Sequence, residues 1–267
     1  MTLTRRNGIG LRAETAVSTG RWFRTAKPDP DPRLRLICFP HAGGTASFFR
    51  SWAPLVPAGV ELMAVRYPGR EDRLLEPFAE TMRDLVAPLT TACRGLLGRP
   101  AVFFGHSMGA SVAYEVALRL RAQGIAAPSA LLVSGRSGPG SKPVRSVARL
   151  DDAELIDDMR LIGGTDEQIL DDPELRELVL PAVRADYRLV EEYTAEPTEP
   201  LTVPVIAYYG TEDPDIDAET VGAWSTVTSS TFDVRSFDGD HFYLADQAAV
   251  LVDDLFTRLR CHTNLFA

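Results

Sequence analysis

The sequence is poor in cysteine and has no long hydrophobic run. Its three cysteines, Cys38, Cys93 and Cys261, lack the spacing of metal ligands, and an odd number does not suit a disulfide framework. The longest apolar stretches, such as residues 203–209, are strand-length and far shorter than the roughly 20 residues that cross a bilayer. Residues 1–20 contain arginines but no continuous apolar segment of a secretory signal. We therefore expect a cytoplasmic protein with no metal site and no membrane partner.

Basic residues are outnumbered by acidic ones, with 28 lysines and arginines against 37 aspartates and glutamates. The formal net charge of the 267 residues is -9, which disfavours nucleic acid and anionic membranes as partners. Hydrophobic residues make up 45% and charged residues 24% of the chain, as in ordinary globular proteins. A chain of this length can form one α/β domain with a sizeable core.

The first residues and the remainder of the chain differ in character. Residues 1–31 are mostly polar, and the run K-P-D-P-D-P at Lys27–Pro32 cannot sustain a helix or a strand ladder. We predict a loosely ordered arm over residues 1–31, with Trp22 and Phe23 as its large apolar anchors. Residues 32–267 are expected to form a single domain.

Short apolar strands alternate with helical patterns through this domain, which predicts an α/β fold with a mostly parallel sheet covered by helices on both faces. The expected strands are Leu34–Phe39, Leu62–Tyr67, Ala101–Gly105, Ala130–Ser134, Val205–Tyr209 and Phe232–Phe237. The expected helices are Thr81–Leu97, Met108–Gln123, Ala218–Val227 and Ala248–Leu259.

The interval at about residues 143–200 interrupts this alternation. It shows helical patterns at Asp151–Leu161 and Pro173–Tyr193 and no convincing strand, and it is too long for an ordinary connection. Ligands bind at the carboxyl edge of open α/β sheets. We therefore predict a helical lid inserted over that edge.

The most specific local motif is G-H-S-M-G at residues 105–109. It fits the G-x-S-x-G pattern of a nucleophile elbow, and it lies between a predicted strand and a predicted helix. A sharp strand-to-helix turn projects the central side chain outward, and the helix N-terminus favours developing negative charge. We predict that Ser107 is a catalytic nucleophile.

A serine nucleophile needs a histidine base and a carboxylate that orients the base. Of the four histidines, His241 lies in the loop after the last predicted strand, where the chain order Ser-Asp-His places the base. The carboxylate is expected after the strand that follows the lid. There we prefer Asp213, with Asp215 and Glu212 as alternatives.

The backbone amides that would bind an oxyanion are expected from two places in the sequence. One is the residue after the nucleophile, Met108. The other is the glycine-containing loop F-P-H-A-G-G at residues 39–44, in which Ala42 is the expected donor.

Five motifs together resemble the type II thioesterases that accompany modular polyketide synthases and nonribosomal peptide synthetases. They are F-P-H-A-G-G-T-A-S-F-F, Y-P-G-R-E, G-H-S-M-G-A, Y-G-T-E-D and G-D-H-F-Y, in this order along the chain. The resemblance runs from about Trp22 to the last helix. It implies the α/β-hydrolase fold, a mobile helical lid, the triad Ser107, Asp213 and His241, and an oxyanion hole of Ala42 and Met108.

The resemblance also implies a substrate and a partner. Such enzymes hydrolyse aberrant or stalled acyl groups from the phosphopantetheine arm of carrier proteins, so no cofactor is expected beyond the arm that belongs to the substrate. We expect a free-standing monomer, and the locally basic stretch Arg136–Arg149, with Lys142 and Arg145, is either a docking patch for an acidic carrier or a solvated linker. Tyr67–Glu71 (Y-P-G-R-E) either lines the entrance or forms a turn with a surface ion pair.

Two other functions remain open. A carboxylesterase acting on small free esters would use the same triad. A non-catalytic relative that only binds ligands is disfavoured, because such proteins usually lose a member of the triad and this chain retains all three residue types in order.

Overall fold

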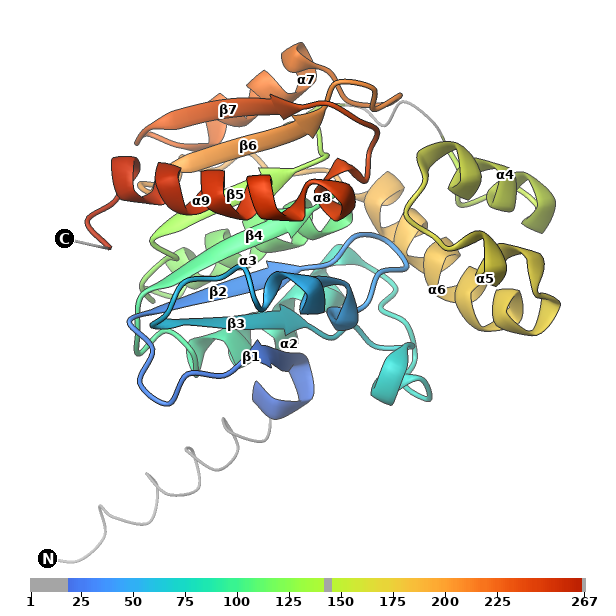
Figure 1. The fold of residues 1–267 in the computed structure, drawn as a ribbon, viewed down its shortest axis with the longest axis horizontal. Helices are drawn as coiled ribbons and strands as arrows, with labels where there is room; N and C mark the ends of the chain where they lie inside the picture. Colours follow the sequence, from blue (N-terminus) through green and yellow to red (C-terminus); the bar gives the residue numbers. More distant parts are fainter. Residues whose placement is uncertain (1–18, 142–145, 266–267) are drawn as a thin grey trace, which may run out of the picture.

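The computed structural model describes residues 19–141 and 146–265. In these residues a seven-stranded sheet has the order β1-β3-β2-β4-β5-β6-β7 (Figure 1). All neighbouring strands are parallel except β1, which is antiparallel to β3. The strands are β1 Phe23–Lys27, β2 Leu34–Phe39, β3 Val60–Val65, β4 Ala101–His106, β5 Ala130–Ser134, β6 Val205–Gly210 and β7 Phe232–Phe237.

Helices cover both faces of the sheet, which explains why every residue of β4 and β5 is buried. One hydrophobic cluster joins the sheet to α2 (Met82–Arg94), α3 (Met108–Ala122), α7 (Ala218–Gly222) and the 3-10 helix Ala223–Val227. A second cluster on the opposite face includes the 3-10 helix Ala46–Trp52, α8 (Tyr243–Asp246) and α9 (Ala248–His262). The six strands predicted from the sequence are all present, with ends that differ by at most two residues.

Three further helices form a separate layer beside the carboxyl ends of the strands (Figure 1). They are α4 (Asp152–Ile162), α5 (Glu167–Asp171) and α6 (Pro173–Glu192). Their inner faces share a small hydrophobic cluster that includes Leu155, Leu170 and Val183. This helical insertion lies within the predicted lid at 143–200, although α5 was not predicted and residues 143–145 lie outside the described residues. We call α4, α5 and α6 the lid.

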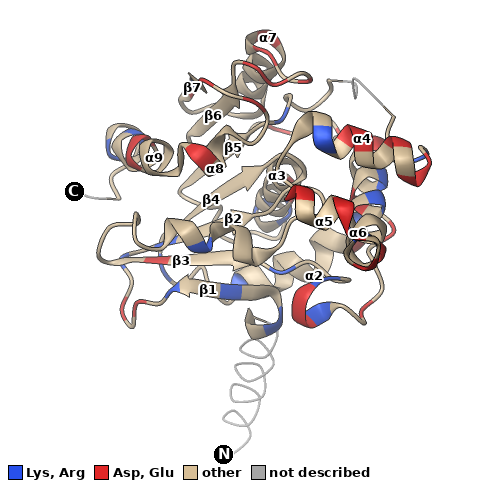
Figure 2. Ribbon diagram, turned by 45° about the vertical axis from the view of Figure 1, so that its right-hand side comes forward, with Lys and Arg blue, Asp and Glu red and all other residues tan. Residues whose placement is uncertain are grey.

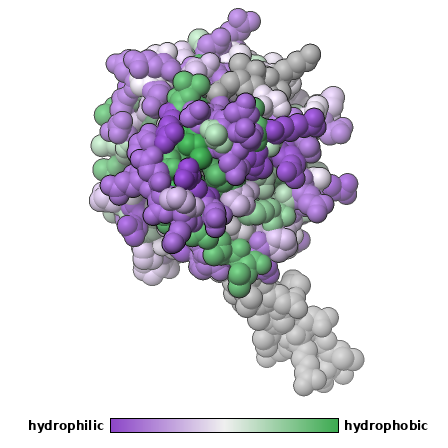
Figure 3. Space-filling model, turned by 90° about the vertical axis from the view of Figure 1, so that its right-hand side faces the viewer, coloured by the Kyte–Doolittle hydropathy of each residue, from purple (hydrophilic) through white to green (hydrophobic). Residues whose placement is uncertain are grey.

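The outer surface of the lid is mixed in chemistry. Acidic residues gather on α4 and α5 (Figure 2). The face of the molecule that carries the lid also shows a hydrophobic patch surrounded by hydrophilic side chains (Figure 3). Exposed leucines of the lid are Leu161, Leu175 and Leu178.

The prediction of a loosely ordered arm over residues 1–31 is wrong for residues 23–27. Residues 23–27 form β1, an edge strand in which Phe23 pairs with Val65 of β3, and Trp22 and Phe23 are only 7% and 4% exposed. The sequence prediction missed this strand because it is short and carries Arg24 and Lys27, as edge strands often do. Residues 1–18 lie outside the described residues. No helix in the described ranges is long and apolar enough to cross a membrane.

Candidate active site

Four strand ends bring the predicted site residues to one edge of the sheet. The loop at residues 40–44 follows β2, Ser107 follows β4, Asp213 follows β6, and His241 follows β7. Because these strands are parallel, their carboxyl ends meet at the same edge. Ala42, Ser107 and His241 line one cavity there.

Ser107 occupies a strained corner between β4 and α3. Its backbone angles, φ 54 and ψ -121, lie in a region that only glycine adopts easily, and its N–H donates to the Ser134 carbonyl at 2.8 Å. The corner is tight: a Cβ at Gly109 would lie 2.0 Å from the Phe39 carbonyl oxygen, so that position must be glycine. This is the local geometry of a nucleophile elbow.

His241 is paired with Asp213. Its Nδ1 lies 2.5 Å from Asp213 Oδ2, and both side chains are nearly inaccessible to solvent. The other carboxylate oxygen of Asp213 accepts a hydrogen bond from the Asp215 amide at 3.0 Å, which fixes the orientation of the carboxylate. Of the three acids considered from the sequence, Asp213 is the one whose carboxylate contacts His241 in the described structure. Asp215 lines the cavity, and Glu212 is exposed to solvent.

Two other histidines lie close to His241, and neither has a carboxylate partner among the described residues. The ring centroid of His106 is 4.9 Å from that of His241, and the ring of His41 is 5.9 Å from that of His106. Burial and the neighbouring His241 lower the pKa of His41 to about 3, with a further contribution from Arg70. Burial and the same neighbour lower the pKa of His106 well below its usual value. These two rings therefore stay neutral near pH 7, and of the three histidines it is His241 that contacts a carboxylate.

A chain of hydrogen bonds holds His106 in place beside His241. His106 Nδ1 lies 2.9 Å from Ser134 Oγ, which lies 2.7 Å from Tyr243 Oη. The sequence did not predict this series of hydrogen bonds. The one feature of the sequence that pointed toward it is the tyrosine of the G-D-H-F-Y motif, Tyr243.

The loop at residues 40–44 lies at the edge of the cavity as a compact turn. The Gly44 amide donates to the His41 carbonyl at 3.0 Å, and Ala42, inside this turn, contributes to the cavity wall. Met108 is the first residue of α3, so its amide has no acceptor within the helix. The two amides proposed from the sequence therefore lie in the loop after β2 and at the first residue of α3, and Ala42 shares a cavity with Ser107.

The cavity has a volume of about 390 Å³ and is closed on one side by the lid. Its apolar wall comes from Met159, Ile162, Val183, Val190 and Trp224. A cavity of this size and composition suits a small organic group. In the described ranges, no group of three or more histidine, cysteine and acidic side chains could hold a metal ion.

The basic stretch Arg136–Arg149, either a docking patch or a solvated linker, is only partly described. Lys142 and Arg145 lie outside the described residues. Arg136 lines the cavity, where its Nε donates to Ser111 Oγ at 3.1 Å, so it contributes to the cavity wall.

A serine on such an elbow, a buried histidine–aspartate pair at the same cavity and a mostly parallel sheet define the α/β-hydrolase class. The thioesterase-domain family model matches residues 34–259, and the chain therefore belongs to the thioesterase family.

Among curated proteins, the chain is 42% identical over 245 residues to thioesterase PikA5 of Streptomyces venezuelae, covering 91% of this chain and 87% of the relative. Among solved structures, it is similar to the type II thioesterase BorB from the borrelidin biosynthetic cluster, with 38% identity, a TM-score of 0.82, and coverage of 89% and 97% of the two chains. RedJ, a thioesterase from the prodiginine pathway of Streptomyces coelicolor, gives 37% identity, a TM-score of 0.82, and coverage of 86% and 88%.

Proposed function

We propose that this protein is a type II thioesterase that hydrolyses aberrant or stalled acyl groups from the phosphopantetheine arm of carrier proteins. These carriers belong to a polyketide synthase or a nonribosomal peptide synthetase, and the enzyme acts beside them in the cytoplasm. The observation that carries the proposal is the convergence of the Ser107 elbow and the His241–Asp213 pair on one cavity. The similarity to BorB and PikA5 supports the thioester as the bond that is cleaved.

Ser107 is the proposed nucleophile and His241 the proposed base. In the first step Ser107 Oγ attacks the thioester carbonyl carbon and its proton passes to His241 Nε2. The tetrahedral adduct collapses, the carrier thiolate leaves, and it takes the proton from His241. In the second step His241 removes a proton from water, which attacks the acyl-serine ester. The adduct then collapses, the bond to Ser107 Oγ breaks, and His241 returns the proton to Ser107 Oγ as the free acid leaves.

Asp213 serves this cycle through His241. Its carboxylate accepts a hydrogen bond from Nδ1–H, which leaves Nε2 free to act as the base, and it stabilises the imidazolium that forms in each step. His41 and His106 remain neutral and do not compete for the proton.

The amides of Ala42 and Met108 are the proposed donors to the oxyanion. A backbone N–H is already oriented before reaction, so it stabilises the developing charge without reorganisation. The proposed cycle needs neither a metal ion nor a cofactor, because the phosphopantetheine arm arrives with the substrate.

The test is release of free acid from acetyl-, propionyl- and longer acyl-carrier proteins, beside matched small-molecule esters. We expect faster turnover of the carrier substrates and a loss of about 10³-fold or more for Ser107→Ala and Asp213→Asn. Asp238→Asn, which removes an exposed carboxylate of the loop after β7, is the control. Turnover confined to free esters would instead identify a carboxylesterase, and turnover that persists in Ser107→Ala would refute the assigned nucleophile.

A further inference from the structure

Three hydrogen bonds hold the loop Pro40–Gly44, which carries the proposed oxyanion donor. Tyr67 Oη donates to the Pro40 carbonyl at 3.2 Å, and Arg70 Nη1 lies 3.4 Å from the Gly44 carbonyl oxygen. Between these points, the Gly43 amide donates to Asp186 Oδ2 at 2.8 Å. Tyr67 and Arg70 belong to the Y-P-G-R-E motif, and Asp186 belongs to α6 of the lid.

Arg70 and Asp186 also form an ion pair with each other. Arg70 Nη1 lies 2.5 Å from Asp186 Oδ2, and Nη2 lies 2.9 Å from Oδ1. The two side chains are only 8% and 4% exposed. Burial acts to lower the pKa of Arg70, and Asp186 together with Tyr67 and Glu71 more than offsets this, so the pKa is raised. A bidentate pair at this depth has one favourable geometry, which makes it suited to fixing the elements that it joins.

The lid helix fits the loop closely at this point. Val183 lies one turn before Asp186 on α6 and packs on Gly43, where a Cβ would lie 2.4 Å from Val183 Cγ2. Gly43 also has a φ of +73, which favours glycine. The Gly43–Asp186 hydrogen bond therefore forms only when α6 lies directly against the loop.

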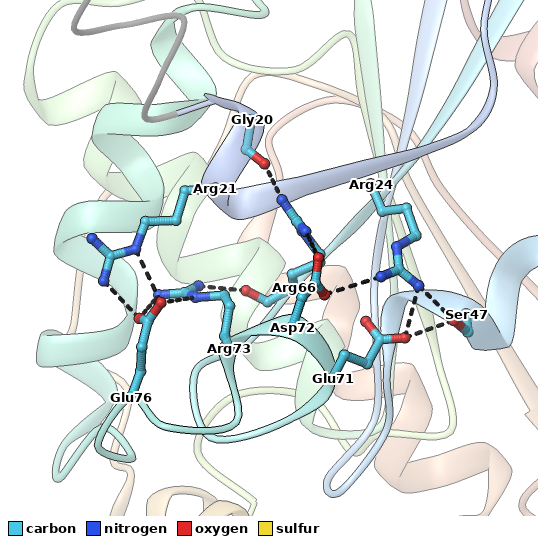
Figure 4. A network of polar contacts seen from close by, with 9 residues as sticks. All are labelled: Gly20, Arg21, Arg24, Ser47, Arg66, Glu71, Asp72, Arg73 and Glu76. Atoms are coloured by element: carbon cyan, nitrogen blue, oxygen red, sulfur yellow. Dashed lines mark hydrogen bonds and ion pairs between the residues drawn. The ribbon is translucent and has the colours of Figure 1, made fainter.

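The turn that carries Arg70 is itself anchored to the sheet by a network of charged side chains (Figure 4). Glu71 Oε1 accepts hydrogen bonds from Arg24 of β1 at 3.1 Å and from Ser47 at 2.6 Å. Asp72 pairs with Arg24 and Arg66. This anchoring places Arg70 at a defined position relative to the sheet, and its ion pair with Asp186 places α6 relative to the same turn.

We propose that Arg70 and Asp186, assisted by Tyr67, are positioning residues that orient the oxyanion-hole loop, so that the hole is complete only while α6 lies against the loop. The proposal rests on the proposed function, because it assumes that the Ala42 amide binds the oxyanion. The Gly43 amide belongs to the next peptide unit, so its bond to Asp186 restricts the direction of the Ala42 N–H. The lid thereby acts on the rate of the chemical step as well as on the shape of the cavity.

The test compares a transition-state mimic with a ground-state mimic. An acyl trifluoromethyl ketone adds to Ser107 and places its oxygen in the oxyanion hole, whereas a thioether analogue of an acyl-pantetheine binds without being attacked. If the loop is misplaced, kcat and affinity for the ketone should fall together, and affinity for the thioether and KM should change little.

The main variant is Arg70→Met with Asp186→Leu, which removes both charges and the acceptor for Gly43 without leaving one buried charge unpaired. We expect kcat and affinity for the ketone each to fall about 10- to 100-fold, since small misplacements of a catalytic group have effects of this size. Arg70→Met with Asp186→Asn restores an uncharged acceptor for the Gly43 amide and should recover part of the loss. Such rescue is not expected of a pair that only stabilises the fold.

A matched control is Arg235→Met with Asp254→Leu, which removes another ion pair with a buried aspartate, on β7 and α9, away from the cavity. It should leave kcat and both affinities of the folded enzyme unchanged. Folding of each variant is checked by circular dichroism and thermal unfolding. If the leucine variant does not fold, Tyr67→Phe tests the same proposal, with an expected loss of about 5-fold in kcat and in ketone affinity from one missing hydrogen bond.

Two results would overturn the proposal. One is a folded Arg70→Met, Asp186→Leu enzyme, or Tyr67→Phe in its place, with wild-type kcat and ketone affinity. The other is a parallel loss of affinity for the ketone and the thioether, which would mean that the pair only closes the lid. Failure of the proposed function is recognised separately, because it would show in the wild type and in Ser107→Ala before any of these variants is compared.

Discussion

Replacing His41 with phenylalanine should make the protein more resistant to acid. The ring of His41 is buried between Phe48 and Phe242, with centroid distances of 4.9 Å and 4.7 Å, and burial, His241 and Arg70 all lower its pKa. Its Nδ1 has no hydrogen-bond partner among the described residues. A phenyl ring at this position would therefore lose no hydrogen bond at that atom, and it would remove a group that the unfolded chain protonates more readily than the folded protein does.

The magnitude follows from the two pKa values of His41. The unfolded chain binds the proton below its usual pKa of 6.5, whereas the folded protein binds it only near pH 3. The stability contributed by the neutral ring is complete above pH 6.5 and is lost progressively as the pH falls below it. Between about pH 7 and about pH 5, this one histidine should reduce the free energy of unfolding by about 2 kcal/mol. His106, also buried and neutral, adds a loss of the same sign.

The assay is urea unfolding of wild type and His41→Phe at these two pH values. The difference in free energy of unfolding between the two proteins should shift by about 2 kcal/mol in favour of the variant at the lower pH. This comparison cancels the carboxylates that titrate in both proteins. His262→Gln, which removes a histidine paired with Asp233 near the C-terminus, is the control and should give no such gain. An equal pH dependence in wild type and His41→Phe would refute the reasoning.

Two further predictions follow from burial and close packing. Gly43→Ala should lower the free energy of unfolding by about 1–3 kcal/mol and reduce kcat, because the added methyl group would meet Val183 and the backbone is at positive φ. Urea unfolding and the acyl-carrier assay measure the two effects, and wild-type values in both would contradict the prediction. Iodoacetamide should modify exposed Cys261 in the native protein, whereas Cys38 and Cys93 should react only after unfolding, since burial raises the pKa of both thiols. Mass spectrometry of the labelled peptides measures this, and rapid labelling of Cys38 in the native state would contradict it.

Local sequence patterns were sufficient for most of the secondary structure. The buried parallel strands are continuous apolar runs, and the flanking helices have apolar residues at helical spacing, so each element could be recognised from its own residues. The nucleophile elbow is equally local, because strand, turn and helix are adjacent in the chain. β1 was missed because its pairing with β3, which lies more than thirty residues further on, decides its conformation more than its own composition does.

The carboxylate that pairs with His241 could not be chosen from local sequence patterns. Glu212, Asp213 and Asp215 lie within four residues, and composition does not distinguish them. The turn after β6 decides which carboxylate faces the β7 loop, and the Asp215 amide holds that carboxylate in place. The order of the residues along the chain could therefore narrow the choice to this turn, and the contact with His241 depends on the packing of two loops.

By itself the sequence determined the α/β class, the helical insertion and the position of the elbow, since these depend on interactions between residues close in the chain. Only the tertiary structure decided that the Y-P-G-R-E turn and the lid helix meet at the loop after β2. Asp186 reads in the sequence as one more acid on an amphipathic helix, and its contacts with Arg70 and Gly43 span 116 and 143 residues. Such contacts exist only after the sheet has brought the strand ends together, because no local pattern records which distant residues a side chain will meet.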